Sequence, residues 1–401
     1  MKSIDKSTDS AYLLLKNEIE ETFGKKINSA RDCLLLSEEV FSKNSFTVNS
    51  NTLRRFFGLV KSPNSPSHTT VDILSKYCGF ASFDEFKKLK NNFKKSTQDY
   101  YSQSILNYLV SLFKETTVKN YRDKTFVGVT ENTINFLQRH PELIDKFQRA
   151  VSKTKNGQDF YYEQFVNVDG LNSYYGNSLR YYLVEKKNAE AQIFGHSVLC
   201  LKDWLSENTV GVKKHYDEVI KYSLTKISRP DLYGRFFATQ LFFTEIFGLP
   251  KEKILTRILQ SHNAIRQKND DFRLFPHFEY VIAPALLLSG HPEEALYYID
   301  YAFNNYPDKD TRMEQGFYQT MYLIKALVCC MTDRNKEAEK LYLQLFPARF
   351  YFLSKKINTI LYIFLSQHLY KKDPGSDLQM NDLIKETGFI RLHKILKIYI
   401  S

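Results

Sequence analysis

Residues 48–80 read VNSNTLRRFFGLVKSPNSPSHTTVDILSKYCGF, and their pattern predicts two short helices joined by a proline-containing loop. Asn49 or Ser50 is a suitable N-cap for the first helix, because Asn and Ser side chains satisfy free backbone N–H groups. Its apolar side chains follow a 3.6-residue period, which places on one face Leu53, Phe56, Phe57 and Val60. We therefore expect this face to pack against a core.

The opposite face of that helix is polar and basic. It carries Asn51, Thr52, Arg54 and Arg55, and Lys61 follows in the loop. Arg can pair bidentately with guanine and Asn with adenine, and Thr can contact a thymine methyl group. No acidic residue stands between Glu39 and Asp72, so this interval has a positive field that suits a phosphate backbone. These five residues form the predicted DNA-binding site.

The flanking residues predict further short helices. The second helix is expected to begin at Ser67 and to stop at Gly79, with an inward face formed by Val71, Leu74 and Cys78. Ser82 and Glu85 then have capping-box spacing for one more short helix, whose inward residues would be Phe83, Phe86 and Leu89. Upstream, one helix is expected at Ser10–Phe23, and Ser29 and Asp32 are expected to cap another that runs to about Phe41.

Ser50–Gly58 and Pro66–Gly79 resemble the recognition helix and the following helix of the Cro/phage-repressor (XRE-type) DNA-binding family. The resemblance covers about a quarter of the chain and implies a helix-turn-helix domain at residues 1–95. One departure is the span SKNSFTVNS before the recognition helix, which is longer than the family's tight turn. The residues also leave open a small helical domain in which Arg54 and Arg55 only solvate the surface.

Length, charge and cysteine content limit the domain number, the kind of partner and the compartment. The 401 residues suffice for two or three domains, and the formal net charge of +11 favours anionic partners such as nucleic acid. The five cysteines show no C-x-x-C spacing, and their odd number indicates a reducing compartment. No signal-peptide pattern opens the sequence, and no apolar run reaches the length of a membrane-spanning helix. We therefore expect a cytoplasmic protein without a membrane partner.

The middle of the chain predicts helices with little functional signal. The polar stretch Lys94–Ser104 is the expected boundary, after which residues 105–230 form a helical middle region. Three Tyr-Tyr pairs lie between Tyr161 and Tyr182, and they predict either helix packing, which we favour, or an aromatic ligand pocket. Ala189–Leu205 is expected to be a long helix that carries the only Trp.

Residues 231–401 show small residues at repeat-like offsets. These are Ala283, Gly290, Ala295, Ala302 and the closing Pro307, followed in a weaker second unit by Ala326, Asp333, Ala338 and Pro347. The pattern resembles tetratricopeptide (TPR) repeats, although Ala295 and Ala338 are further apart than the repeat's ~34-residue period. The resemblance implies an irregular TPR-like α-solenoid whose concave face binds a peptide or protein.

Enzyme signals are weak. Arg257 and His262 have the R-x4-H spacing that resembles a HEPN ribonuclease site, and the alternative is that both are exposed on a helix. His277 and Glu279 form H-x-E, but the P-C-x-x-C of zinc deaminases does not follow. No phosphate-binding glycine loop occurs. We therefore predict no catalytic residues, no cofactor and no metal site.

The sequence as a whole predicts an all-α protein: a small helix-turn-helix domain followed by an irregular TPR-like α-solenoid. The arrangement resembles peptide-sensing regulators of Gram-positive bacteria, which implies a bacterial transcriptional regulator that binds double-stranded DNA and a peptide or protein ligand. A homodimer is expected, because one recognition helix reads few base pairs and two half-sites restore affinity. The alternatives are a TPR-like scaffold that binds protein partners without DNA and, more remotely, the ribonuclease.

Overall fold

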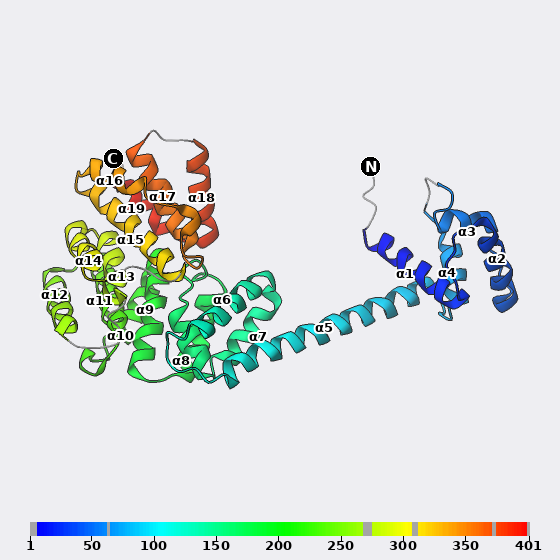
Figure 1. The fold of residues 1–401 in the computed structure, drawn as a ribbon, viewed down its shortest axis with the longest axis horizontal. Coiled ribbons are helices and arrows are strands. Elements are labelled where there is room, and N and C mark those ends of the chain that lie inside the picture. Colours follow the sequence, from blue (N-terminus) through cyan, green and yellow to red (C-terminus); the bar gives the residue numbers. More distant parts are fainter. Residues whose placement is uncertain (1–5, 62–64, 268–274, 307–311, 371–373, 399–401) are drawn as a thin grey trace. The chain divides into compact units, whose positions relative to one another are not determined.

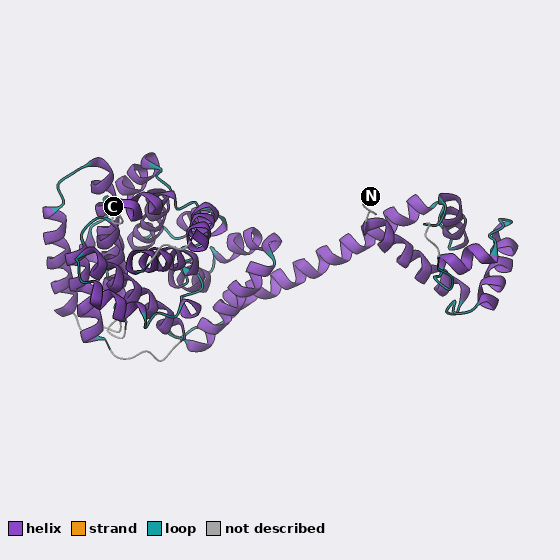
Figure 2. Cartoon of the chain, turned by 90° about the horizontal axis from the view of Figure 1, so that it is seen from above, coloured by secondary structure: helices purple, strands orange, loops and turns teal. Residues whose placement is uncertain are grey.

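The computed structural model describes residues 6–61, 65–267, 275–306, 312–370 and 374–398. Every regular element within these ranges is a helix, as Figure 2 shows, and the all-α prediction is confirmed. The chain divides into two compact units, Met1–Ile105 and Leu106–Ser401. The division falls within α5 (Phe83–Glu115), so the polar stretch around residues 94–104 is helical.

The N-terminal unit is built from short helices, drawn in blue in Figure 1, and from the first part of α5. These helices are α1 (Lys6–Phe23), α2 (Ala30–Asn44), α3 (Ser50–Phe56) and α4 (His68–Tyr77). One apolar core joins them, and its fully buried members are Leu15, Ile19, Cys33, Leu36, Val40, Leu53, Leu74 and Phe86. Each helix thus contributes one apolar face, as the sequence period requires.

Local sequence signals predicted the starts of α2 and α4, whereas α1 begins at Lys6 and not at the predicted Ser10. Ser29 and Asp32 form a reciprocal capping box at α2. Ser67 caps α4, and Gly79 follows that helix with φ +90°, a conformation that glycine adopts without strain.

Two predictions of inward residues are wrong. α3 ends at Phe56 because Gly58, with φ +79°, stops the helix, so Val60 lies beyond it and is 37% exposed. The helix that begins after Ser82 is not short, because it is the start of α5. Along it Phe83 and Phe86 are buried, but Leu89 is 49% exposed.

The second unit, called the body below, consists of the end of α5 and the helices that follow. The first are α6 (Lys124–Arg139), α7 (Pro141–Val151), the π-helix η1 (Gly157–Gln164), α8 (Tyr174–Glu185), α9 (Ala189–Leu205) and α10 (Thr209–Val219). After the short 3₁₀ turn η2 (Leu224–Lys226) come α11 (Pro230–Phe247), α12 (Glu252–Gln267), α13 (His277–Leu288), α14 (Pro292–Asn305) and α15 (Arg312–Met331). The last are α16 (Asn335–Tyr342), the 3₁₀ turn η4 (Pro347–Arg349), α17 (Lys355–Leu369), α18 (Pro374–Thr387) and α19 (Ile390–Ile398).

Consecutive helices of the body pack as pairs, including α9 with α10, α13 with α14, α15 with α16, and α17 with α18. α9 matches the predicted helix at both ends, and its Trp204 is fully buried. The predicted small residues lie at helix contacts, where these side chains are fully buried: Ala283, Ala295, Ala302, Ala326 and Ala338. Pro307 lies outside the described residues.

Candidate functional site

The predicted DNA-binding residues lie on and just after α3. Asn51, Arg55 and Lys61 are exposed, while Thr52 and Arg54 are half-buried. On the other side of the helix Leu53 and Phe56 are buried in the core, so the predicted division into an inner and an outer face is present. Neither Arg55 nor Lys61 has an ion-pair partner in the described part of the chain. Both charges are therefore available to an anionic partner.

Arg54 is held by its neighbour on the same helix. Its Nη1 donates a hydrogen bond to Oδ1 of Asn51 at 3.1 Å, while its Nε is buried without a hydrogen-bond partner. The backbone N–H of Asn51 in turn donates to Oδ1 of Asn49, the N-cap of α3, at 2.8 Å. These bonds fix the direction of two of the predicted base-reading side chains.

The connection between α2 and α3 is shorter than the sequence suggested. α2 continues to Asn44, beyond the predicted end at Phe41, and Ser45 then adopts the left-handed conformation with φ +55°. Only Ser45–Asn49 separate the two helices. Ser37 of α2 donates a hydrogen bond to the backbone oxygen of Val48 at 2.6 Å, which ties the connection to α2.

The body contains a second candidate site that the sequence did not reveal. It is a cavity of about 1270 Å³ with walls from α6, η1, α11, α13, α15 and α17. Eight basic and five acidic side chains are among its described lining residues. Ligand cavities are commonly about 300–1,000 Å³, so this one is large enough for an organic ligand of substantial size.

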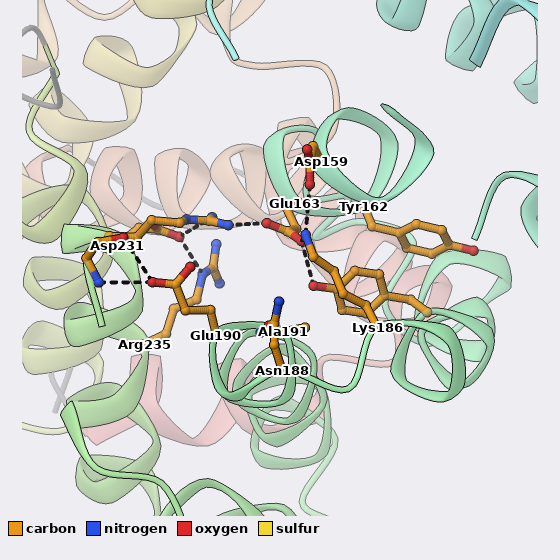
Figure 3. A network of polar contacts seen from close by, with 12 residues as sticks. Asp159, Tyr162, Glu163, Lys186, Asn188, Glu190, Ala191, Asp231 and Arg235 are labelled. Atoms are coloured by element: carbon orange, nitrogen blue, oxygen red, sulfur yellow. Dashed lines mark hydrogen bonds and ion pairs between the residues drawn. The ribbon is translucent and has the colours of Figure 1, made fainter. Parts of the chain in front are cut away.

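A network of ion pairs lies along one wall of this cavity, as Figure 3 shows. Arg229 binds Asp231 through two hydrogen bonds, Nε to Oδ1 at 3.1 Å and Nη2 to Oδ2 at 2.9 Å, and it also binds Glu163. Lys186 bridges Asp159 and Glu163, with Nζ–O distances of 2.7 and 2.5 Å. Bidentate and charge-assisted bonds of this kind are the strongest class in proteins.

Oppositely charged neighbours shift the pKa values of Arg229 and Asp231 toward their charged forms. Burial alone would lower the pKa of Arg229, but the carboxylates of Asp231 and Glu163 outweigh burial and raise it. For Asp231, burial favours the neutral acid, yet Arg229 and Arg235 hold its pKa below the usual value. Arg229 and Asp231 are therefore both ionised at neutral pH.

Arg235 is the exception in this network. Its side chain is 15% exposed and lines the cavity, and its Nε has no hydrogen-bond partner. The nearest carboxylate oxygen, Oδ2 of Asp231, is 3.7 Å away and is already bonded by Arg229. Burial lowers the pKa of Arg235, an effect that Asp231 offsets only in part.

The remaining candidate residues from the sequence lie in different surroundings from those expected or in the core. His262 is not exposed as expected, because its side chain is 1% exposed and its Nε2 lies 2.7 Å from Oε1 of Glu279. Arg257 is exposed, and its Nη1 donates to Gln240 at 3.2 Å, so the two residues of the R-x4-H spacing do not share a surface. The Tyr-Tyr pairs belong mainly to the core, as we favoured, since the buried tyrosines include Tyr161, Tyr162, Tyr175 and Tyr182.

The cavity residues could not be found from motifs, because they come from many segments that lie far apart in the sequence. One signal was present in α11, whose sequence PDLYGRFFATQLFFTEIF is apolar on every side. Such a helix is buried, so Asp231 and Arg235 in its first turns had to face a polar interior.

No family model, curated protein or solved structure matches the chain. Within the described residues, no helix is long and apolar enough to cross a membrane. The same residues contain no group of three or more His, Cys, Asp or Glu side chains arranged to hold a metal ion.

Proposed function

We propose that the chain is a DNA-binding transcriptional regulator. Its N-terminal unit would contact double-stranded DNA through α3, and its TPR-like body would dimerise or bind a peptide or protein ligand. The observation that carries this proposal is the outer face of α3, where Asn51 and Arg55 are exposed, with Lys61 just beyond, opposite the buried Leu53 and Phe56.

The geometry around α3 supports an XRE-like arrangement. A capped α2, a five-residue connection and a capped α3 succeed one another, which is close to the short turn of a helix-turn-helix unit. The side chains presented by α3 are amide and guanidinium groups, which are the groups that read purine edges. Lys61 adds a positive charge that suits a phosphate.

The body supports the second half of the proposal. Its paired helices bury alanines at their contacts, and the turn between α13 and α14 contains Gly290 with φ +82°. These features are typical of TPR-like hairpins, in which small residues allow two helices to approach closely. A cavity inside such a body offers a place where a signal could bind.

The proposal is tested with the full chain and a labelled duplex that it retains from a pool of genomic fragments. Arg55→Ala and Lys61→Ala are expected to weaken binding and to reduce its salt dependence, because each removes a charge that displaces counterions. Lys88→Ala is the matched control, since Lys88 is an exposed lysine of the same unit that lies on α5. If all three variants bind like the unmodified chain, α3 is not the DNA-contacting surface.

A further inference from the structure

The cavity of the body is divided into a polar part and an apolar part. Along one face of α11 the lining residues are Asp231, Arg235, Ala238 and Phe242, which run from charged to apolar over three helical turns. α13 shows the same order, from His277 and Tyr280 near its start to Leu288 at its end. The two polar ends adjoin, because an added Cβ at Gly234 of α11 would lie 3.0 Å from the backbone oxygen of Phe278.

Several lining residues of the cavity have a buried polar atom without a hydrogen bond, beginning with Nε of Arg235. Besides Arg235, three lining residues have a buried polar atom without a hydrogen bond, namely Oε1 of Gln164, Oγ of Ser197 and Oη of Tyr351. Buried polar groups are nearly always satisfied, so such atoms in the lining of a cavity favour a ligand that carries polar groups. The guanidinium of Arg235 favours an anionic group there, because the adjacent Asp231 is already bonded bidentately by Arg229.

The opening of the cavity has a matching charge. Four of its lining lysines are exposed and have no ion-pair partner within the described residues: Lys114, Lys119, Lys124 and Lys155. Glu131 and Glu190 are the acidic lining residues without such a partner among the described residues, so these four lysines outnumber them. A positive opening attracts anions and raises their rate of association.

The apolar part supplies a contrasting surface. Its lining residues, contributed by α11, α13, α15 and α17, include Phe242, Ala285, Leu288, Ile324 and Leu361. Burying an apolar group of the ligand against this wall is favourable, because apolar surface is removed from water. The ligand must therefore combine an apolar portion with a charged head.

We propose that this cavity binds an amphipathic organic anion, whose carboxylate or phosphate is bonded by Arg235 and whose apolar portion lies along the later turns of α11 and α13. The proposal gives a ligand class to the body of the regulator and depends on that proposed function only for its regulatory meaning. An acyl carboxylate and the C-terminal carboxylate of a short apolar peptide share this chemistry.

The test uses the full chain without DNA, so a failure here is distinct from a failure of DNA binding. Calorimetric titration and the thermal midpoint are measured with octanoate, octyl phosphate, octan-1-ol and octylamine, below their micelle concentrations. A second pair is acetyl-Leu-Phe-Leu as the free acid and as the amide. We expect at least one anion to bind and to raise the thermal midpoint, whereas the matched alcohol, amine or amide binds at least tenfold more weakly. Which anion binds tightest identifies the acyl, phosphoryl or peptide source.

Variants then locate the bound head group. Arg235→Gln is expected to weaken binding of the anion about ten- to hundredfold, and Arg235→Lys less, because a charge-assisted hydrogen bond is lost or only weakened. The double variant Lys119→Ala/Lys124→Ala is expected to bind the anion more weakly and with a smaller dependence on salt. It tests the proposal independently if Arg235→Gln does not fold. Lys340→Ala, an exposed lysine of α16 outside the cavity lining, is the control. Absence of binding by every anion, equal binding of octan-1-ol, or unchanged affinity in folded Arg235→Gln would overturn the proposal, as would unchanged affinity in the double lysine variant.

Discussion

The carboxylate of Asp169 accepts a hydrogen bond from the backbone N–H of Lys356, 187 positions further along the chain, at an Oδ2–N distance of 2.8 Å. Its other oxygen accepts from the backbone N–H of Ile357 at 3.2 Å, so Asp169 satisfies two N–H groups in the first turn of α17. The backbone N–H of Asp169 also donates to the oxygen of Leu353 at 3.0 Å. A loop before α8 thereby holds the start of a helix near the end of the chain.

Asp169→Ala is expected to lower the free energy of unfolding of the body by about 1–3 kcal/mol, because two N–H groups lose a charged acceptor. Denaturant unfolding of the full chain, followed by a probe in the body such as Trp204 fluorescence, measures the change. Asp217→Ala removes a carboxylate that is 46% exposed and that, among the residues the structure describes, forms an ion pair only with Lys213. It serves as the control, with an expected change within about 0.5 kcal/mol. Equal effects of the two substitutions would show that the long-range cap is not stabilising.

Stability should also depend on pH through two adjacent histidines. Nδ1 of His196 lies 2.9 Å from Nδ1 of His215, and Nε2 of His215 lies 3.4 Å from Oδ2 of Asp203. Burial lowers the pKa of both histidines. The pKa of His215 falls from 6.5 to about 3, because burial is reinforced by His196, Lys214 and Lys202 and only partly opposed by Glu218. Below pH 6.5 the unfolded chain therefore binds protons that the folded chain does not.

The contribution of these histidines to the free energy of unfolding is complete above their pKa in the unfolded chain. It is lost as the pH falls toward their pKa in the folded chain. Between pH 7 and about pH 4.5, we expect this to remove about 1–3 kcal/mol of stability. His215→Gln abolishes the titration of one ring and should flatten the decline, measured by denaturant unfolding across that range. An identical pH profile in the variant would contradict this assignment.

His262 is expected to stabilise the fold rather than to cleave RNA. Its imidazole is enclosed by Phe278, Tyr298 and Tyr301 and pairs with buried Glu279. His262→Ala should cost about 3–5 kcal/mol, because buried Glu279 loses its partner at 2.7 Å and keeps only the 3.5 Å hydrogen bond from Oη of Tyr306. Adding Glu279→Gln should recover part of that loss. If His262→Ala kept the unmodified thermal midpoint but removed an RNA-cleaving activity of the chain, the ribonuclease alternative would gain support.

Asn51 and Arg54 are expected to act as a coupled pair in DNA binding. Arg54→Ala should cost about 1–3 kcal/mol of binding and relax specificity if its guanidinium reads a base. Because Asn51 accepts from Arg54 at 3.1 Å, the double variant should lose less than the sum of the two single variants. Affinities for a cognate and a scrambled duplex separate base reading from phosphate contact. Additive losses would mean that the two side chains contact DNA independently.

Local signals account for the parts of the fold that the sequence predicted. Capping residues such as Ser29 and Ser67 act within one turn, so helix starts could be read from a few neighbouring residues. The end of α3 was missed although Gly58 signalled it, because the apolar spacing continued to Val60. The cavity could not be predicted, because Glu163 and Arg229 meet only through packing of distant helices. Where such groups converge depends on tertiary contacts that periodicity does not encode.

We propose that the N-terminal unit makes the chain a sequence-specific DNA-binding protein. The most direct measurement is binding of the purified full chain to random genomic duplex fragments at two salt concentrations, followed by sequencing of the retained fragments. We expect enrichment of a short palindrome and an affinity that falls steeply as salt rises. Retention that is indifferent to both sequence and salt, or no retention at all, would contradict it and would favour a scaffold that binds proteins alone.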